Sequence, residues 1–105
     1  MIVLPVLDLK GQLGNKWSTE NQVGKITEEY KEVIEALEMH KKSYSCITRD
    51  ELAMEIMDLI VSSVGALRML ELEENLNVEE IGDVTYRKLA SRGWSIEKMI
   101  TVKRV

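Results

Sequence analysis

Two acidic pairs form the clearest chemical pattern in the chain. Glu29 and Glu32 are three residues apart, and so are Glu55 and Asp58, which places both members of each pair on one face of a helix. The second pair lies within the apolar stretch 52–70, where unpaired carboxylates are costly to bury. A divalent cation would remove that cost, so the pattern predicts a site for Mg²⁺, or for Mn²⁺ in its place.

The two pairs belong to two predicted helices that a short turn connects. Apolar positions recur at the helical period from Ser18, a predicted N-cap, to about Lys42. Thr48 and Glu51 have the spacing of a capping box, which predicts a second helix over about 48–73. Helices joined by such a short turn pack as antiparallel neighbours. Glu32 then lies roughly 15 Å from the turn, and Glu55 and Asp58 lie roughly 10 and 14 Å from it, so the two pairs are at nearly the same level of the hairpin.

The second helix is apolar on most of its circumference, which indicates burial on all sides. A chain of 105 residues cannot surround such a helix alone, so we expect a homodimer or homotetramer. Asn77 and Glu80 predict a third helix that runs to about Arg92 and stops at Gly93. Residues 95–100 are predicted to add a final helical turn or two.

The first sixteen residues differ in composition from the rest of the chain. They contain Pro5, Gly11 and Gly14, which favour an extended N-terminal arm over residues 1–16. Apolar residues in this arm and in segment 100–102 would suit two short paired strands. Residues 17–105 are predicted to form a single all-α domain.

Composition restricts the classes of function. The net charge of −4 argues against binding of a nucleic acid polymer. Cys46 and His40 are the single residues of their kinds, which excludes an internal disulfide and a Cys/His zinc site. The carboxylates and Arg68 make membrane insertion of the stretch 52–70 expensive, and residues 1–9 lack a basic signal-peptide region. We therefore expect a cytoplasmic protein without membrane contact.

Three further residues are candidates for substrate binding. Lys88 and Arg92, one helical turn apart, could reach a phosphate group, although basic residues at a helix end also complement the helix dipole. Trp17 could stack on a base, although a tryptophan at a helix start more often serves packing.

The acidic segments resemble a known family. Residues 26–37 (ITEEYKEVIEAL) followed by 50–60 (DELAMEIMDLI) resemble the E-E-x-x-E, then E-x-x-D, signature of the MazG-like all-α nucleoside triphosphate pyrophosphohydrolases. Residues 88–94 (KLASRGW) resemble the K-x-x-x-R-G-[WFY] segment that often follows the third helix in that family. The resemblance covers residues 17–94.

The resemblance implies a fold and a reaction. The fold would be an antiparallel helical hairpin plus a third helix, assembled as a four-helix-bundle-like oligomer. The reaction would be Mg²⁺-dependent cleavage of an NTP or dNTP to its monophosphate and pyrophosphate, as nucleotide-pool housekeeping. Glu29, Glu32, Glu55 and Asp58 match the metal ligands of the motif, and one of them would activate water.

The sequence is also compatible with two other functional classes. The chain could be a non-catalytic helical dimerisation module whose acidic pairs make salt bridges between subunits, although Arg68 is the single basic residue in the stretch 52–70. It could also be a nucleotide-binding regulator that keeps the metal site without turnover. The pattern names neither the preferred nucleotide nor the carboxylate that activates water.

Overall fold

The computed structural model describes residues 2–102, and this range is helical with no strand. The elements are α1 (Leu9–Leu13), α2 (Thr19–Lys42), α3 (Cys46–Glu74) and α4 (Val78–Ser91). The all-α prediction is confirmed for the described range, and the suggested pairing of terminal strands is wrong. Met1 and residues 103–105, which belong to the predicted arm and domain, lie outside the described residues.

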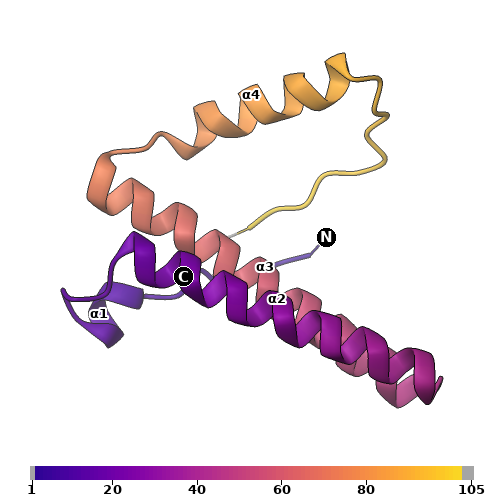
Figure 1. Ribbon diagram of the computed structural model, residues 1–105. Coiled ribbons are helices and arrows are strands. Elements are labelled where there is room, and N and C mark those ends of the chain that lie inside the picture. The colour runs from indigo at the N-terminus through magenta and orange to yellow at the C-terminus, as the bar shows by residue number, and fades with distance from the viewer. Residues whose placement is uncertain (1, 103–105) are drawn as a thin grey trace.

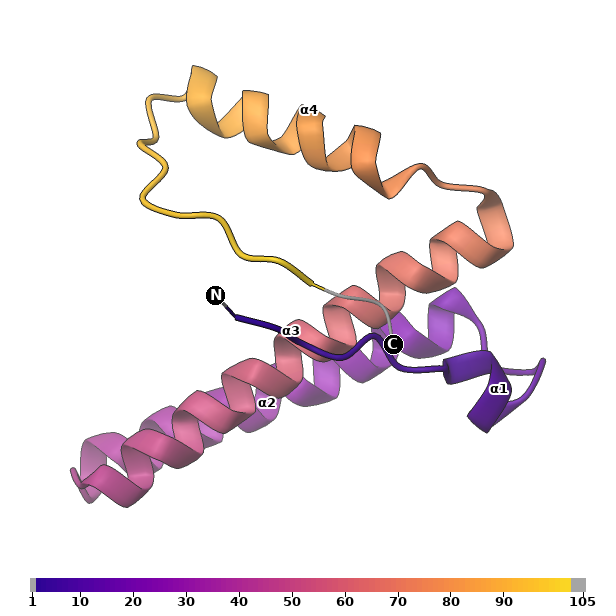
Figure 2. The same ribbon diagram turned by 180° about the vertical axis from the view of Figure 1, so that it is seen from behind.

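Helices α2 and α3 form the predicted antiparallel hairpin and pack along most of their length (Figures 1 and 2). Ser18 is the N-cap of α2, as predicted, and its hydroxyl accepts a hydrogen bond of 3.2 Å from the backbone N–H of Asn21. The hairpin places one face of α2 against one face of α3. Side chains from the middle of both helices therefore meet.

The predicted cap of α3 is wrong by one turn. Ser45 is the N-cap, and its hydroxyl accepts the Thr48 N–H at 3.1 Å while the Thr48 hydroxyl accepts the Ser45 N–H at 3.2 Å. These two reciprocal hydrogen bonds satisfy the backbone N–H groups of Ser45 and Thr48. The helix therefore begins one turn earlier than a helix capped by Thr48 would. The Thr48 hydroxyl also lies 2.7 Å from Nδ1 of His40 in α2. This contact links the two helices across the turn.

The N-terminal arm is not extended throughout, because Leu9–Leu13 form the short helix α1. The Asp8 carboxylate accepts the Gly11 N–H at 3.0 Å and starts this helix. Glu73, near the end of α3, connects α1 to the start of α2. It accepts a hydrogen bond of 3.0 Å from the Thr19 hydroxyl and lies 3.4 Å from the ammonium of Lys10.

Helix α4 begins and ends close to its predicted bounds. The Asn77 side chain accepts the Glu80 N–H at 3.1 Å, and Gly93 adopts a φ of 88° where the helix has ended. The prediction of further helical turns over 95–100 is wrong, because this segment has no regular structure. A helix of six residues forms too few hydrogen bonds to offset the cost of nucleation. Residues 95–100 are also exposed, so packing does not stabilise a helix there.

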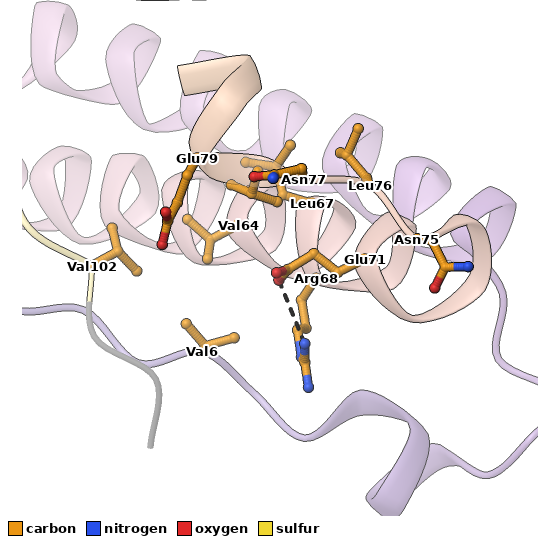
Figure 3. Close-up of a pocket in the computed structure, with 11 residues that line it drawn as sticks. Val6, Val64, Leu67, Arg68, Glu71, Asn75, Leu76, Asn77, Glu79 and Val102 are labelled. Carbon is orange, nitrogen blue, oxygen red and sulfur yellow. Dashed lines mark ion pairs between the residues drawn. The ribbon is translucent and has the colours of Figure 1, made fainter. Parts of the chain in front are cut away.

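The hydrophobic core is small. Among the described residues, the apolar side chains that are buried are Leu4, Ala66 and Met69. Helix α4 stands away from the hairpin, and the segment after it runs back toward α3, where Val102 lies near Val64 (Figures 1 and 3). The accessible surface is 8144 Å², whereas a compact monomer of this mass exposes about 6,000 Å². The radius of gyration is 15.9 Å, against about 13 Å for a compact domain of this length.

No helix among residues 2–102 is both long enough and apolar enough to cross a lipid bilayer.

Candidate metal centre

Three of the four predicted carboxylates meet between α2 and α3. Glu29 and Glu32 come from α2, Glu55 comes from α3, and one carboxylate oxygen of each lies within 4.8 Å of the other two. The capped hairpin explains this meeting, because the turn fixes the register in which α2 and α3 lie side by side. Carboxylate oxygens from two helices converging on one point can coordinate a hard cation.

The environment of these carboxylates differs from that of an ordinary acidic surface. Glu29 is 7% exposed, Glu55 is partly buried and Glu32 is exposed. The Oε2 atoms of Glu29 and Glu55 are both buried and have no hydrogen-bond partner among the described residues. Burying a carboxylate oxygen without a partner is costly, so a positively charged ligand at this place would stabilise the fold.

Lys25 supplies part of the positive charge. Its ammonium lies 3.2 Å from Glu29 Oε1 and 3.5 Å from Glu28, on the neighbouring turn of α2. The hydrogen bond to Glu29, followed by the attraction of its charge, raises the pKa of Lys25 above its usual value. One ammonium cannot neutralise three carboxylates, and Glu29 Oε2 has no hydrogen-bond partner in the part of the chain that the structure describes. The cluster therefore keeps an excess of negative charge.

Asp58, the fourth predicted ligand, is exposed and is not part of the three-carboxylate cluster. It follows Glu55 by three residues and so lies on the same side of α3. A carboxylate in this position can reach an ion through a metal-bound water, since Mg²⁺ commonly keeps several of its waters.

The three predicted substrate residues fall into two groups. Trp17 lies in the segment before α2 and is half-buried, with its indole N–H donating a hydrogen bond of 3.0 Å to Gln22. Lys88 and Arg92 are exposed at the end of α4, which stands apart from the hairpin (Figures 1 and 2). Within one chain they do not join the carboxylates.

Sequence reasoning missed two residues on the same face of α2. Gln22 and Lys25 precede Glu29 by seven and four residues, a spacing that aligns all three along the helix. Gln22 is 3% exposed, an unusual degree of burial for a polar side chain. The helical spacing from Glu29 could have identified both, but an isolated glutamine and lysine carry no signal of their own.

A hollow of about 980 Å³ lies away from the carboxylates, between the end of α3, the start of α4 and the two terminal segments (Figure 3). Val6 and Val102 from those segments line it, together with an ion pair of 3.5 Å between Arg68 and Glu71. None of the four predicted carboxylates lines this hollow. Its volume alone therefore gives no reason to place chemistry there.

The chain was compared with known protein families, curated proteins and solved structures, and no match was found in any of the three. The assignment of a function therefore depends on the residues and their geometry. Carboxylate oxygens, such as those that Glu29, Glu32 and Glu55 offer, are ligands that Mg²⁺ and Mn²⁺ prefer.

Proposed function

We propose that this chain is a Mg²⁺- or Mn²⁺-dependent nucleoside triphosphate pyrophosphohydrolase of the MazG-like type. The observation that carries the proposal is the meeting of Glu29, Glu32 and Glu55, with two oxygens that are buried and unpartnered among the described residues. The order and spacing of the acidic motifs that resemble this family support the same reaction. The product would be a nucleoside monophosphate with release of pyrophosphate.

The arrangement suggests a division of roles. Glu29 and Glu55 would hold the cation through their buried oxygens, and Asp58 would contact it through water. The ion, when bound, supplies charge neutralisation for the triphosphate and lowers the pKa of a coordinated water. Glu32 is the exposed member of the cluster and so is the best placed to take a proton from that water.

The proposed step is a hydrolysis with a simple balance of atoms. The water oxygen forms a bond to the α-phosphorus as the bond from that phosphorus to the oxygen bridging to the β-phosphate breaks. The leaving group is pyrophosphate, which carries the bridging oxygen away. The proton from water goes to Glu32 and then to solvent, which returns the carboxylate to its charged form.

Self-association belongs to the proposal because a single copy leaves too much apolar surface uncovered. The surface of 8144 Å² exceeds the expectation for a compact monomer by about 2,000 Å², more than one partner buries in a standard interface. Exposed apolar side chains include Val23 and Tyr30 on α2, and Met54 and Met57 on α3. We propose a homodimer or homotetramer built on these faces of the hairpin.

A non-catalytic dimerisation module, whose acidic pairs would make salt bridges between subunits, has less support. Basic residues are sparse on α3, because Arg68 is the single one in the stretch 52–70.

The proposal is tested by pyrophosphate release from a panel of NTPs and dNTPs with Mg²⁺ or Mn²⁺. We expect release that requires metal, stops with EDTA and is lost in Glu55→Gln. Glu38→Gln is the matched control, because Glu38 is exposed on α2 and lies outside the cluster. Absence of metal-dependent release from every nucleotide would contradict the proposed reaction.

A further inference from the structure

A smaller hollow of about 450 Å³ lies at the start of α2, and one of its lining residues, Lys25, pairs with Glu29 of the cluster. Its apolar wall comes from Leu7, from Leu9 and Leu13 of α1, and from Trp17 between α1 and α2. Its polar lining comes from α1, α2 and α3: Gln12, Gln22, Lys25, Glu28 and Ser62. A concave site of this size, mostly apolar with a few polar groups, is typical of small-molecule binding.

The Gln22 amide is held in one orientation. Its Oε1 accepts from the Trp17 indole N–H at 3.0 Å, and its Nε2 donates to the backbone carbonyl of Ser62 at 3.0 Å. An indole N–H can only donate and a carbonyl can only accept, so the amide cannot be turned over. An amide offers two N–H groups and two lone pairs. One of each therefore stays unused by the described residues, and the side chain lines the hollow.

Gly65 of α3 makes room for this arrangement. A Cβ atom at this position would lie 2.9 Å from Gln22 Nε2 and 3.1 Å from Leu9 Cδ1. Glycine inside a helix is destabilising relative to alanine, so a buried glycine at such a contact indicates a close approach that the fold requires. The floor of the hollow thus depends on α3, while α1 and the segment before it form the wall.

Lys25 connects the hollow to the candidate metal centre. Its side chain lines the hollow, and its ammonium lies 3.2 Å from Glu29. Gln22, Lys25 and Glu29 follow one another along one face of α2, and the rise of the helix puts Glu29 about 10 Å beyond Gln22. A ligand lying along this face would place one end in the hollow, a negative portion beside Lys25 and its far end at the carboxylates.

We propose that this hollow receives the base and sugar of the nucleoside triphosphate, an inference that rests on the proposed function. The leucines and the Trp17 ring cover the base, and the unused N–H and lone pair of Gln22 bind its polar edge. Lys25 leaves Glu29 and pairs with the triphosphate when metal occupies the cluster, because a cation at Glu29 repels the ammonium. The N-terminal segment is therefore part of the substrate site.

Fluorescence of Trp17 tests this assignment without requiring turnover. The chain has two tryptophans, so Trp94→Phe leaves Trp17 as the single indole, and Trp94 is exposed and outside the hollow. Adding NTP with Mg²⁺ should change the Trp17 emission in a saturable manner. In the matched Trp17→Phe protein, Trp94 emission should stay constant. A Trp17 emission that does not change on addition of any NTP would overturn the proposal.

A second variant tests the same hollow kinetically. Leu13→Glu places a negative charge in its wall, at a side chain that is partly exposed and so should not unfold the chain. We expect KM for the NTP to rise at least about tenfold with kcat and Mn²⁺ affinity little changed. Val3→Glu is the control, because Val3 is similarly exposed in the same segment and does not line the hollow.

The outcomes separate this inference from the proposed reaction. One outcome is that pyrophosphate is released, while KM is unchanged in Leu13→Glu and Trp17 emission does not respond to NTP. This outcome would refute the nucleoside site in the hollow and leave the proposed reaction standing. A saturable Trp17 response without any pyrophosphate release would keep the hollow and refute the reaction. A Leu13→Glu protein with altered metal affinity would also count against the assignment, because the hollow is proposed to bind only the nucleoside part.

Discussion

Glu29 of α2 and Glu55 of α3 bring carboxylate oxygens within 4.8 Å of one another, and each keeps its Oε2 buried without a hydrogen-bond partner among the described residues. Two negative charges at this separation repel each other by on the order of 3 kcal/mol at an effective dielectric constant near 20. A cation bound by both carboxylates, as proposed above, would remove this repulsion.

Asp58→Asn tests whether the exposed fourth carboxylate takes part in the reaction. The change keeps the size of the side chain and removes its charge at an exposed position, so fold and assembly should be unchanged. We expect turnover of NTP to fall by at least about a hundredfold, as for the loss of one electrostatic stabiliser at a reacting phosphate. Full activity in a correctly assembled Asp58→Asn protein would remove this residue from the site.

The oligomeric state follows from the exposed apolar faces of the hairpin. Light scattering should give a mass of two or four times the 12.0 kDa chain at micromolar concentration. Met54→Lys introduces a charge at a methionine that is 59% exposed on α3 and should weaken the assembly. Ser43→Lys, which adds the same charge at the exposed turn, should not. A monomeric wild-type protein would contradict the proposed interface.

Glu73 should make stability depend on pH. The hydrogen bond from the Thr19 hydroxyl, with a smaller contribution from Lys10, lowers the pKa of Glu73 below its usual value of 4.5. A lowered pKa in the folded state means that the stabilisation is present above the usual value and is lost as the pH falls through the folded value.

The variant Glu73→Gln measures this contribution. It should lower Tm by roughly 1–3 °C at pH 7, because exposed charged contacts are weak, and the gap to wild type should close as the pH drops below the usual pKa of the carboxyl group. Glu74→Gln is the control at the neighbouring exposed position. A gap that stays constant between pH 7 and pH 3 would show that the charge of Glu73 does not contribute.

The hairpin and its helix bounds were predictable because they depend on local signals. The Ser18 cap, the helical period of α2 and the Asn77 cap act over three or four residues, and each is found in the structure. The start of α3 was misplaced because Ser45 and Thr48 each offer a capping hydroxyl, and only the earlier choice gives the reciprocal pair. A five-residue helix such as α1 carries too weak a pattern to be recognised.

The candidate site was predictable in part. Helical spacing and the length of the turn brought Glu29, Glu32 and Glu55 to one level, and the structure places them together. The positions of Asp58 and of Gln22 depend on how α2 and α3 rotate against each other, which spacing alone does not fix. The apolar circumference of the second helix predicts an assembly, but one sequence does not define which faces would meet in it.

Metal binding by Glu29 and Glu55 is tested most directly by titrating Mn²⁺ and Mg²⁺ into wild type, Glu55→Gln and Glu38→Gln, with calorimetry and thermal melting. Wild type and Glu38→Gln should bind saturably and melt several degrees higher with metal, because a ligand that binds only the folded state stabilises it by mass action. Glu55→Gln should lose the binding and the metal-dependent rise, yet melt no lower than wild type without metal, since a repulsion has been removed. The account would be contradicted if millimolar metal changed neither the heat signal nor the Tm of the wild-type protein. It would also be contradicted if Glu55→Gln bound metal as wild type does.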